Sequence, residues 1–149
     1  MFDQIKLFFD RHLALPAPDP ELPHKLQTAC AALLIEMMYM DDRVHDEERD
    51  MLESRIQDVF SLTQQDTNEL VALAVQQREQ ATDYYQFTSL INKEFTMEQK
   101  IDLVRSLWQI AYADGELDEM EEYLVRKVSE LLYVPHQAFI MTKNEVNGG

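Results

Sequence analysis

Cysteine, glycine and long apolar runs are all scarce in this chain of 149 residues. Cys30 is the only cysteine, which excludes intramolecular disulfides and every multi-cysteine metal motif. Its apolar neighbours predict an inert thiol in the core. The longest uninterrupted apolar run, 29–35, is far shorter than the roughly 20 residues that cross a bilayer. We therefore expect no membrane-spanning segment.

Basic residues are also few. The chain has 13 Lys and Arg against 28 Asp and Glu, which gives a formal net charge of −15. This charge opposes binding to nucleic acids and to anionic membranes, and it favours cations and basic proteins as partners. Residues 1–15 lack the basic start and apolar stretch of a secretory signal. We expect a cytoplasmic protein.

Apolar residues make up 46% of the sequence, enough for a folded core. Only three glycines occur, two of them at the C-terminus, and no strand-length run alternates with a period of two, so an all-α fold is expected. Three regions are predicted: an amphipathic arm with a Pro-rich linker over 1–23, a helical domain over 24–143, and a disordered tail over 144–149. Helices are expected over 2–13, 24–40, 46–60, 63–77, 83–93, 97–113, from 118 onward, and 135–143.

An internal repeat organises the helical domain. Shifting the sequence by 73 residues pairs Tyr39 with Tyr112 and Asp41 with Asp114. The same shift also pairs Leu34 with Leu107, Val44 with Leu117, Glu48 with Glu121, and Met51 with Leu124. With a one-residue gap the match continues, pairing Phe60 with Leu132, Leu62 with Val134, and Gln65 with Gln137. Two similar helix–acidic turn–helix units are therefore predicted.

Each unit places an Asp, Asp41 or Asp114, at the end of its first helix, where the negative end of the helix dipole disfavours a carboxylate. Each also places a Glu, Glu48 or Glu121, in the first turn of its second helix. Six acidic residues surround each turn. These four residues are the candidate ligands of a divalent cation such as calcium, magnesium or manganese. The two Glu residues have a purely structural alternative, helix capping. The spacing does not fit the twelve-residue EF-hand loop.

The stretch from Ile110 to Leu117, followed by Glu121, resembles the TerB-like domain of bacterial tellurite-resistance proteins. The segment Met38–Asp42, followed by Glu48, repeats the pattern. A related domain begins the membrane-anchored DnaJ-like co-chaperones. The resemblance implies a compact bundle of about seven helices with two pseudo-symmetric units, in which Asp41, Glu48, Asp114 and Glu121 bind metal.

Three functions follow from these patterns. The leading one is a cytoplasmic, non-enzymatic module of a bacterial stress response that binds a divalent cation and serves as a scaffold or sensor, with a protein partner that is basic or part of a membrane-associated complex. The alternative is a metal-independent adaptor whose acidic face binds a basic protein. The third is a metal-dependent enzyme. The four histidines form no zinc or di-iron motif, and no phosphate-binding loop occurs.

Overall fold

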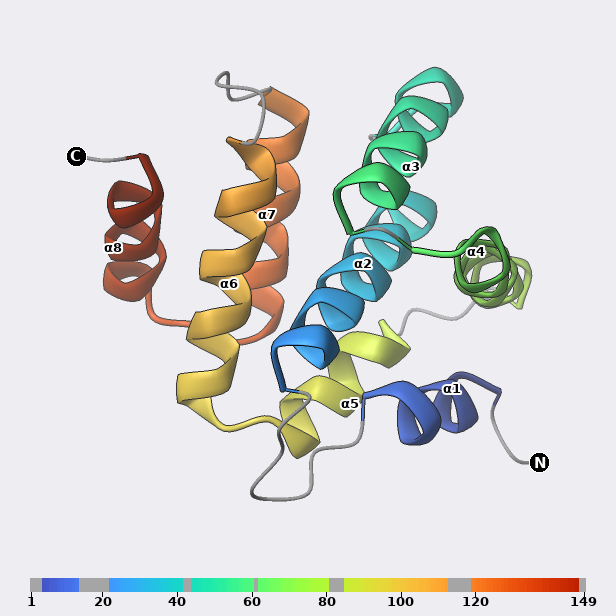
Figure 1. Ribbon diagram of the computed structural model, residues 1–149, viewed down its shortest axis with the longest axis horizontal. Helices are drawn as coiled ribbons and strands as arrows, with labels where there is room; N and C mark the ends of the chain where they lie inside the picture. The colour runs from blue at the N-terminus through green and yellow to red at the C-terminus, as the bar shows by residue number, and fades with distance from the viewer. Residues whose placement is uncertain are drawn as a thin grey trace.

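The computed structural model describes residues 4–13, 22–41, 44–60, 62–80, 85–112 and 119–147. Within these ranges the chain is all-helical, as the sequence predicts, with eight helices and no strand (Figure 1). They are α1 (Gln4–His12), α2 (Leu22–Met40), α3 (Asp46–Phe60), α4 (Gln64–Glu79), α5 (Gln86–Glu94), α6 (Met97–Ala111), α7 (Glu119–Leu131) and α8 (His136–Asn147). The expected bundle of seven helices corresponds to α2–α8, and the expected arm to α1.

Helix α2 is the centre of the bundle, in contact with α3, α4, α5, α6 and α7. Every residue from Thr28 to Tyr39 is buried, because other helices surround this part of α2 on all sides. All but Thr28 and Glu36 in that stretch are apolar, and their burial supplies much of the hydrophobic driving force. Cys30 lies fully buried within it, which confirms the predicted core thiol.

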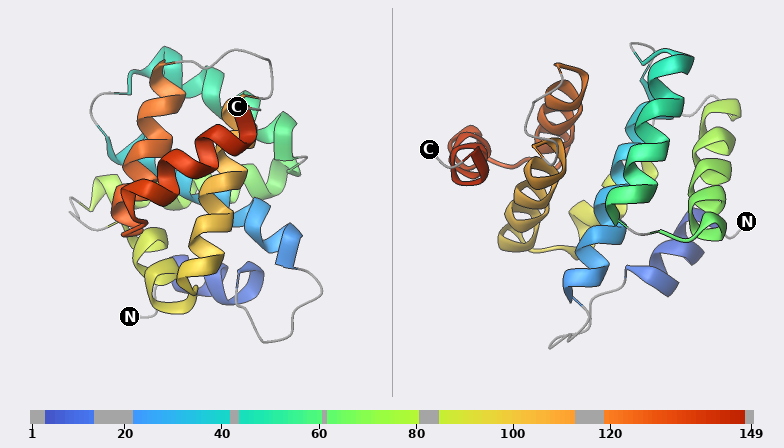
Figure 2. Two further views of the ribbon diagram at one scale, coloured as in Figure 1. Left: turned by 90° about the vertical axis from the view of Figure 1, so that its left-hand side faces the viewer. Right: turned by 45° about the horizontal axis from the view of Figure 1, so that its top comes forward.

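The repeat extends to three helices in each half. Helix α4 packs on α2 in the first half, and α8 packs on α6 in the second. Figure 2 shows α8 crossing the outer face of the second half. The second helix of each half also ends with the same backbone bond: Leu62 N donates to Gln57 O at 3.2 Å, and Val134 N to Ser129 O at 3.0 Å. The fold is therefore α2–α3–α4 and α6–α7–α8, joined by α5.

Burial fixes the register of the repeat in its second helix. Met51 is 60% exposed whereas Leu124, its expected counterpart, is 1% exposed. Leu52 is buried and matches Leu124 instead, so the one-residue gap falls before α3. Leu62 and Val134, whose amides make the equivalent bonds, are separated by the same number of residues as Leu52 and Leu124. In this register Glu121 corresponds to Arg49 rather than to Glu48.

The two halves meet along α2 and α6. The thiol of Cys30 donates to the Leu103 carbonyl oxygen at 3.6 Å, and these residues are 73 positions apart, which is the repeat spacing. Equivalent residues of two related halves touch where the axis relating them passes. The pseudo-symmetry axis therefore runs between α2 and α6 near this contact.

Helix α1 docks on the bundle. Phe8, Phe9 and Ile5 on one of its faces are at most 2% exposed. Phe8 lies edge-on to Phe87 of α5, with ring centroids 5.7 Å apart. An ion pair at 2.9 Å between Arg11 and Glu69 adds a contact to α4. The first helix of the predicted arm is thus part of the core.

Two predicted helix starts are confirmed. Thr63 accepts a hydrogen bond from the amide of Asp66 at 3.0 Å. Thr96 and Gln99 form a complete capping box, with bonds of 3.1 and 2.8 Å. No helix in the described residues is long and apolar enough to span a membrane.

The predicted disordered tail over 144–149 is too long, because α8 continues to Asn147. Two contacts stabilise this last turn. Val146 is half-buried against the core, and Glu145 accepts a hydrogen bond from Arg105 at 2.7 Å. Residues 144–147 contain one apolar residue, too few to show a helical pattern in the sequence.

Candidate functional site at the acidic turns

The candidate site lies at one end of the bundle, where α2 and α6 end and α3 and α7 begin. We call this region the acidic end and define it by Asp41, Asp46, Tyr112 and Glu119. Figure 1 shows α2 and α6 running toward this same end, with α3 and α7 returning from it. The acidic residues at 114, 116 and 118 belong to the second turn by sequence and lie outside the described residues.

Asp41 follows the last residue of α2. Its amide donates to the Met37 carbonyl oxygen at 3.0 Å, and its carbonyl accepts from the amide of Val44 at 3.2 Å. Val44 is 3% exposed, so this apolar side chain anchors the turn in the core. These bonds fix the backbone of Asp41, and its side chain is only partly buried.

Tyr123 connects the two halves at the acidic end. Its hydroxyl, which projects from α7, donates a hydrogen bond to Asp41 Oδ2 of the first half. A carboxylate at a helix C-terminus gains from such a donor, because the bond stabilises its charged form. The contact shows that the start of α7 lies beside the end of α2.

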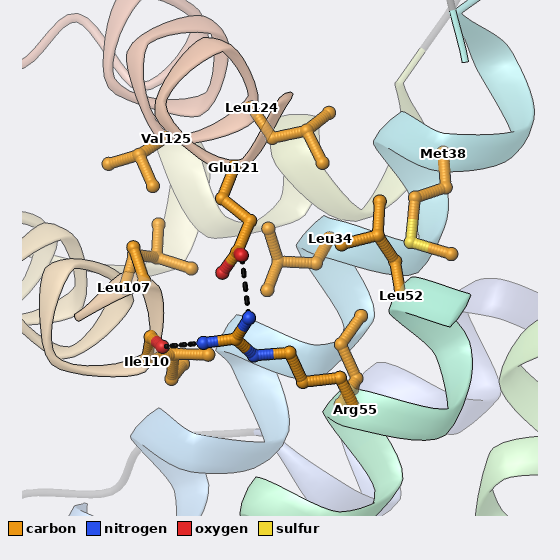
Figure 3. Close-up of a pocket in the computed structure, with 11 residues that line it drawn as sticks. Leu34, Met38, Leu52, Arg55, Leu107, Ile110, Glu121, Leu124 and Val125 are labelled. Atoms are coloured by element: carbon orange, nitrogen blue, oxygen red, sulfur yellow. Dashed lines mark hydrogen bonds and ion pairs between the residues drawn. The ribbon is translucent and has the colours of Figure 1, made fainter. Parts of the chain in front are cut away.

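Arg55 makes a second connection (Figure 3). Its Nη1 donates to Glu121 Oε1 of α7 at 2.7 Å, and its Nη2 donates to the Ile110 carbonyl oxygen of α6 at 3.2 Å. The side chains of Arg55 and Glu121 are 24% and 9% exposed. One guanidinium thus neutralises a buried carboxylate and also faces the negative end of the α6 dipole.

The end of α2 receives a matching cation. Arg78 of α4 donates from Nη1 to the Tyr39 carbonyl oxygen at 2.7 Å. Arg49 lies over the Tyr39 ring at 4.6 Å. The Tyr39 hydroxyl donates to Glu53 at 3.2 Å, and burial, with a smaller contribution from the Glu53 charge, raises the pKa of Tyr39 to about 12. Arg78 and Arg55 therefore bring positive charge from elsewhere in the sequence to the C-terminal ends of α2 and α6.

The structure describes the side chains of two of the four predicted ligands. Asp41 and Glu121 are both at the acidic end, where Tyr123 and Arg55 bind them. Glu48 lies in the first turn of α3, and its side chain and the whole of Asp114 are outside the described residues. Among the side chains that the structure does describe, no group of three or more His, Cys, Asp or Glu could hold a metal ion.

Behind the Arg55–Glu121 pair is a small cavity of ≈ 20 Å³ on the pseudo-symmetry axis. This volume is enough for about one water molecule. Its lining contains three equivalent pairs, Leu34 with Leu107, Met38 with Ala111, and Leu52 with Leu124. The polar pair breaks this symmetry: the counterparts of Arg55 and Glu121 are Lys127 and Arg49, which are both cations.

Glu36 is an ionisable residue that the sequence analysis missed. It is 0% exposed in the middle of α2 and accepts bonds from the amides of Phe87 and Thr88 at 2.8 and 3.2 Å. The Thr88 hydroxyl donates a third bond at 2.9 Å. Burial raises the pKa of Glu36 to about 7, although these donors oppose the shift. A single Glu inside an otherwise apolar helical run was the available signal.

A protein-family model described as "Tellurite resistance protein TerB" matches residues 27–144 of the chain. The match covers α3 to α7 completely and most of α2 and α8, whereas α1 lies outside it. The chain therefore belongs to the TerB family, as the motif resemblance predicts. No curated protein and no solved structure matches it.

Replacing Arg55 by Met tests the bond between the halves. We expect the free energy of unfolding, measured with urea at pH 7, to fall by roughly 1–3 kcal/mol, because the Glu121 carboxylate remains buried without its cation. Adding Glu121→Leu should recover most of this loss, since the unpaired charge is then removed. Arg126→Met is the control: Arg126 is 53% exposed and pairs with Glu122 on its own helix. That change should cost no more than about 0.5 kcal/mol. A double variant as unstable as Arg55→Met would contradict this account.

Proposed function

We propose that this TerB-family chain is a non-enzymatic module of a bacterial stress response, of the tellurite-resistance type, that binds a divalent cation at its acidic end. The observation that carries the proposal is the contact between Tyr123 and Asp41. It supports a single cation site to which both turns contribute, because it brings the second half of the chain against the Asp of the first.

The ligands would be carboxylate oxygens from both turns. Asp41 is the described member of the set, and Asp114 is its repeat counterpart. Hard cations such as calcium, magnesium and manganese prefer oxygen ligands, and six or more are needed around calcium. Water and neighbouring acidic side chains, including Glu48, would complete the shell. Glu121 is already paired with Arg55, so we expect it to support the site mainly by holding α7 in place and only weakly as a direct ligand.

The contacts at the acidic end favour a scaffold or sensor role. A cation shared by the two turns would join the ends of α2 and α6 to the starts of α3 and α7. Tyr123 and Arg55 already tie these helices together across the pseudo-symmetry axis. Cation binding would thus change the rigidity of one end of the bundle, where the chain presents its charged surface to a partner protein.

Titration of chelator-treated protein with calcium, magnesium and manganese tests the site. At least one ion should release or absorb heat and raise the melting temperature, since a ligand at 100 times its Kd stabilises the folded state by about 2.7 kcal/mol. Asp41→Asn and Asp114→Asn should each abolish both effects. Asp58→Asn is the matched control, because Asp58 is exposed near the opposite end of α3. An absence of heat and of stabilisation with all three ions at millimolar concentration would refute the proposal.

A metal-independent adaptor is the second candidate, favoured by the outer face of α3. Glu47, Asp50, Ser54 and Asp58 are exposed along one stripe of this helix, with the 60% exposed Met51 between them. Acidic side chains around an apolar one suit a basic amphipathic helix.

On the adaptor hypothesis, a basic amphipathic peptide should bind with an affinity that falls as salt rises and that ignores chelators. Met51→Asp should weaken binding several-fold, and Met97→Asp, at an exposed residue on α6, should leave it unchanged. Binding that requires a divalent ion would argue for the cation site instead.

A further inference from the structure

The N-terminal end of α5 is held by side chains of other helices. The first amide of α5, at Gln86, donates to Gln77 Oε1 of α4 at 3.2 Å. The next two amides, at Phe87 and Thr88, donate to Glu36 Oε2 and Oε1 of α2. The N-cap residue, Tyr85, makes no side-chain capping bond. Glu36 therefore caps the N-terminus of α5 from another helix, a role that a Ser, Thr or Asp at the N-cap position plays in other helices.

Helix α1 depends on α5 in turn. It packs mainly on α5, through the edge-on contact of Phe8 with Phe87. Phe87 is also one of the residues whose amide Glu36 binds. The chain of contacts runs from a fully buried carboxylate, through the first turn of α5, to a helix outside the matched family domain.

We propose that Glu36 is a proton-sensitive latch, which holds the first turn of α5, and α1 through it, against the rest of the bundle. This inference does not depend on the proposed cation site. When α5 is docked the carboxyl group is buried, and when α5 lifts away water reaches it. A proton on Glu36 then favours the docked arrangement, because burial of the neutral acid costs less than burial of the charged one.

The sign of the pH effect follows from the two pKa values. Undocking returns the Glu36 pKa from about 7 toward its ordinary 4.5. The docked state is thus stabilised by the proton below pH 4.5, and this stabilisation is lost as pH rises through 7. Above that range both states are ionised and the dependence ends. Between pH 5.5 and 8 the ratio of undocked to docked chains should rise roughly 30-fold.

Other charged groups near these helices do not account for this effect. Burial and hydrogen-bond donors are the causes of the Glu36 shift, and no charged group of α3, α6 or α7 is among them. The ionisable neighbours on α4 are Arg78 and Glu79, both exposed, with Arg78 bound to the Tyr39 carbonyl. On α5 they are Lys93 and Glu94, exposed at its far end. On α1 they are the half-buried His12 and the exposed Lys6, Asp10 and Arg11, of which Lys6 and Asp10 pair with each other and Arg11 pairs with Glu69.

Hydrogen exchange of the full-length protein at pH 5.5–8.5, corrected for intrinsic rates, tests the latch. Amides of α5 and α1 should lose protection as pH rises to about 7 and then level off, while α6–α8 stay protected. Glu36→Gln should remove this pH dependence, and Glu94→Gln, at an exposed residue of α5, should keep it. A flat wild-type profile, a profile that survives in Glu36→Gln, or equal loss in all helices would overturn the proposal.

Thr88→Val provides a second variant if Glu36→Gln does not fold. The Thr88 hydroxyl lowers the Glu36 pKa, so its removal should move the midpoint of the exchange profile to higher pH. A purely structural contact would change the overall protection and leave the midpoint in place. An unmoved midpoint would therefore also overturn the latch.

Discussion

The guanidinium of Arg55 connects three helices of the bundle at once. It leaves α3, binds the Glu121 carboxylate of α7 at 2.7 Å, and reaches the Ile110 carbonyl near the end of α6 at 3.2 Å. A buried carboxylate and a helix C-terminus both carry negative charge, so a cation at this position satisfies two groups that would otherwise oppose burial. The equivalent positions in the repeat hold Lys127 and Arg49, so among the described residues this pair has no counterpart, and it favours one arrangement of the two halves.

The acidic end owes its geometry to this lock. Arg55 binds Glu121 in the first turn of α7. Two residues further along this helix, Tyr123 donates a hydrogen bond to Asp41 at the end of α2. Arg78 binds the Tyr39 carbonyl and so places a positive charge against the dipole of α2. The ends of both central helices are thus compensated by arginines from elsewhere in the fold. The turns themselves are the part of the sequence richest in acidic residues, and there a cation is proposed.

Most of the fold could be predicted from the sequence, because it rests on local patterns. The repeat, the caps at Thr63 and Thr96, and the buried thiol of Cys30 each follow from spacing and composition, and the structure confirms them. The polar contacts between helices could not be predicted. Arg55 and Glu121 are 66 residues apart, and Tyr123 and Asp41 are 82 apart. The alignment of α3 with α7 could not be predicted either, because only the exposure of Met51 and the burial of Leu52 show where the gap in the repeat lies.

The two acidic turns are proposed to share one cation site, and paramagnetic broadening by manganese tests this directly. Substoichiometric Mn²⁺ added to isotope-labelled protein should broaden the amide signals of Asp41 and Val44 together with those of Tyr112 and Glu119, at the same concentration. Signals from α5, at the opposite end of the bundle in Figure 1, should remain sharp. Broadening confined to one turn, or spread evenly over the acidic surface, would contradict a shared site.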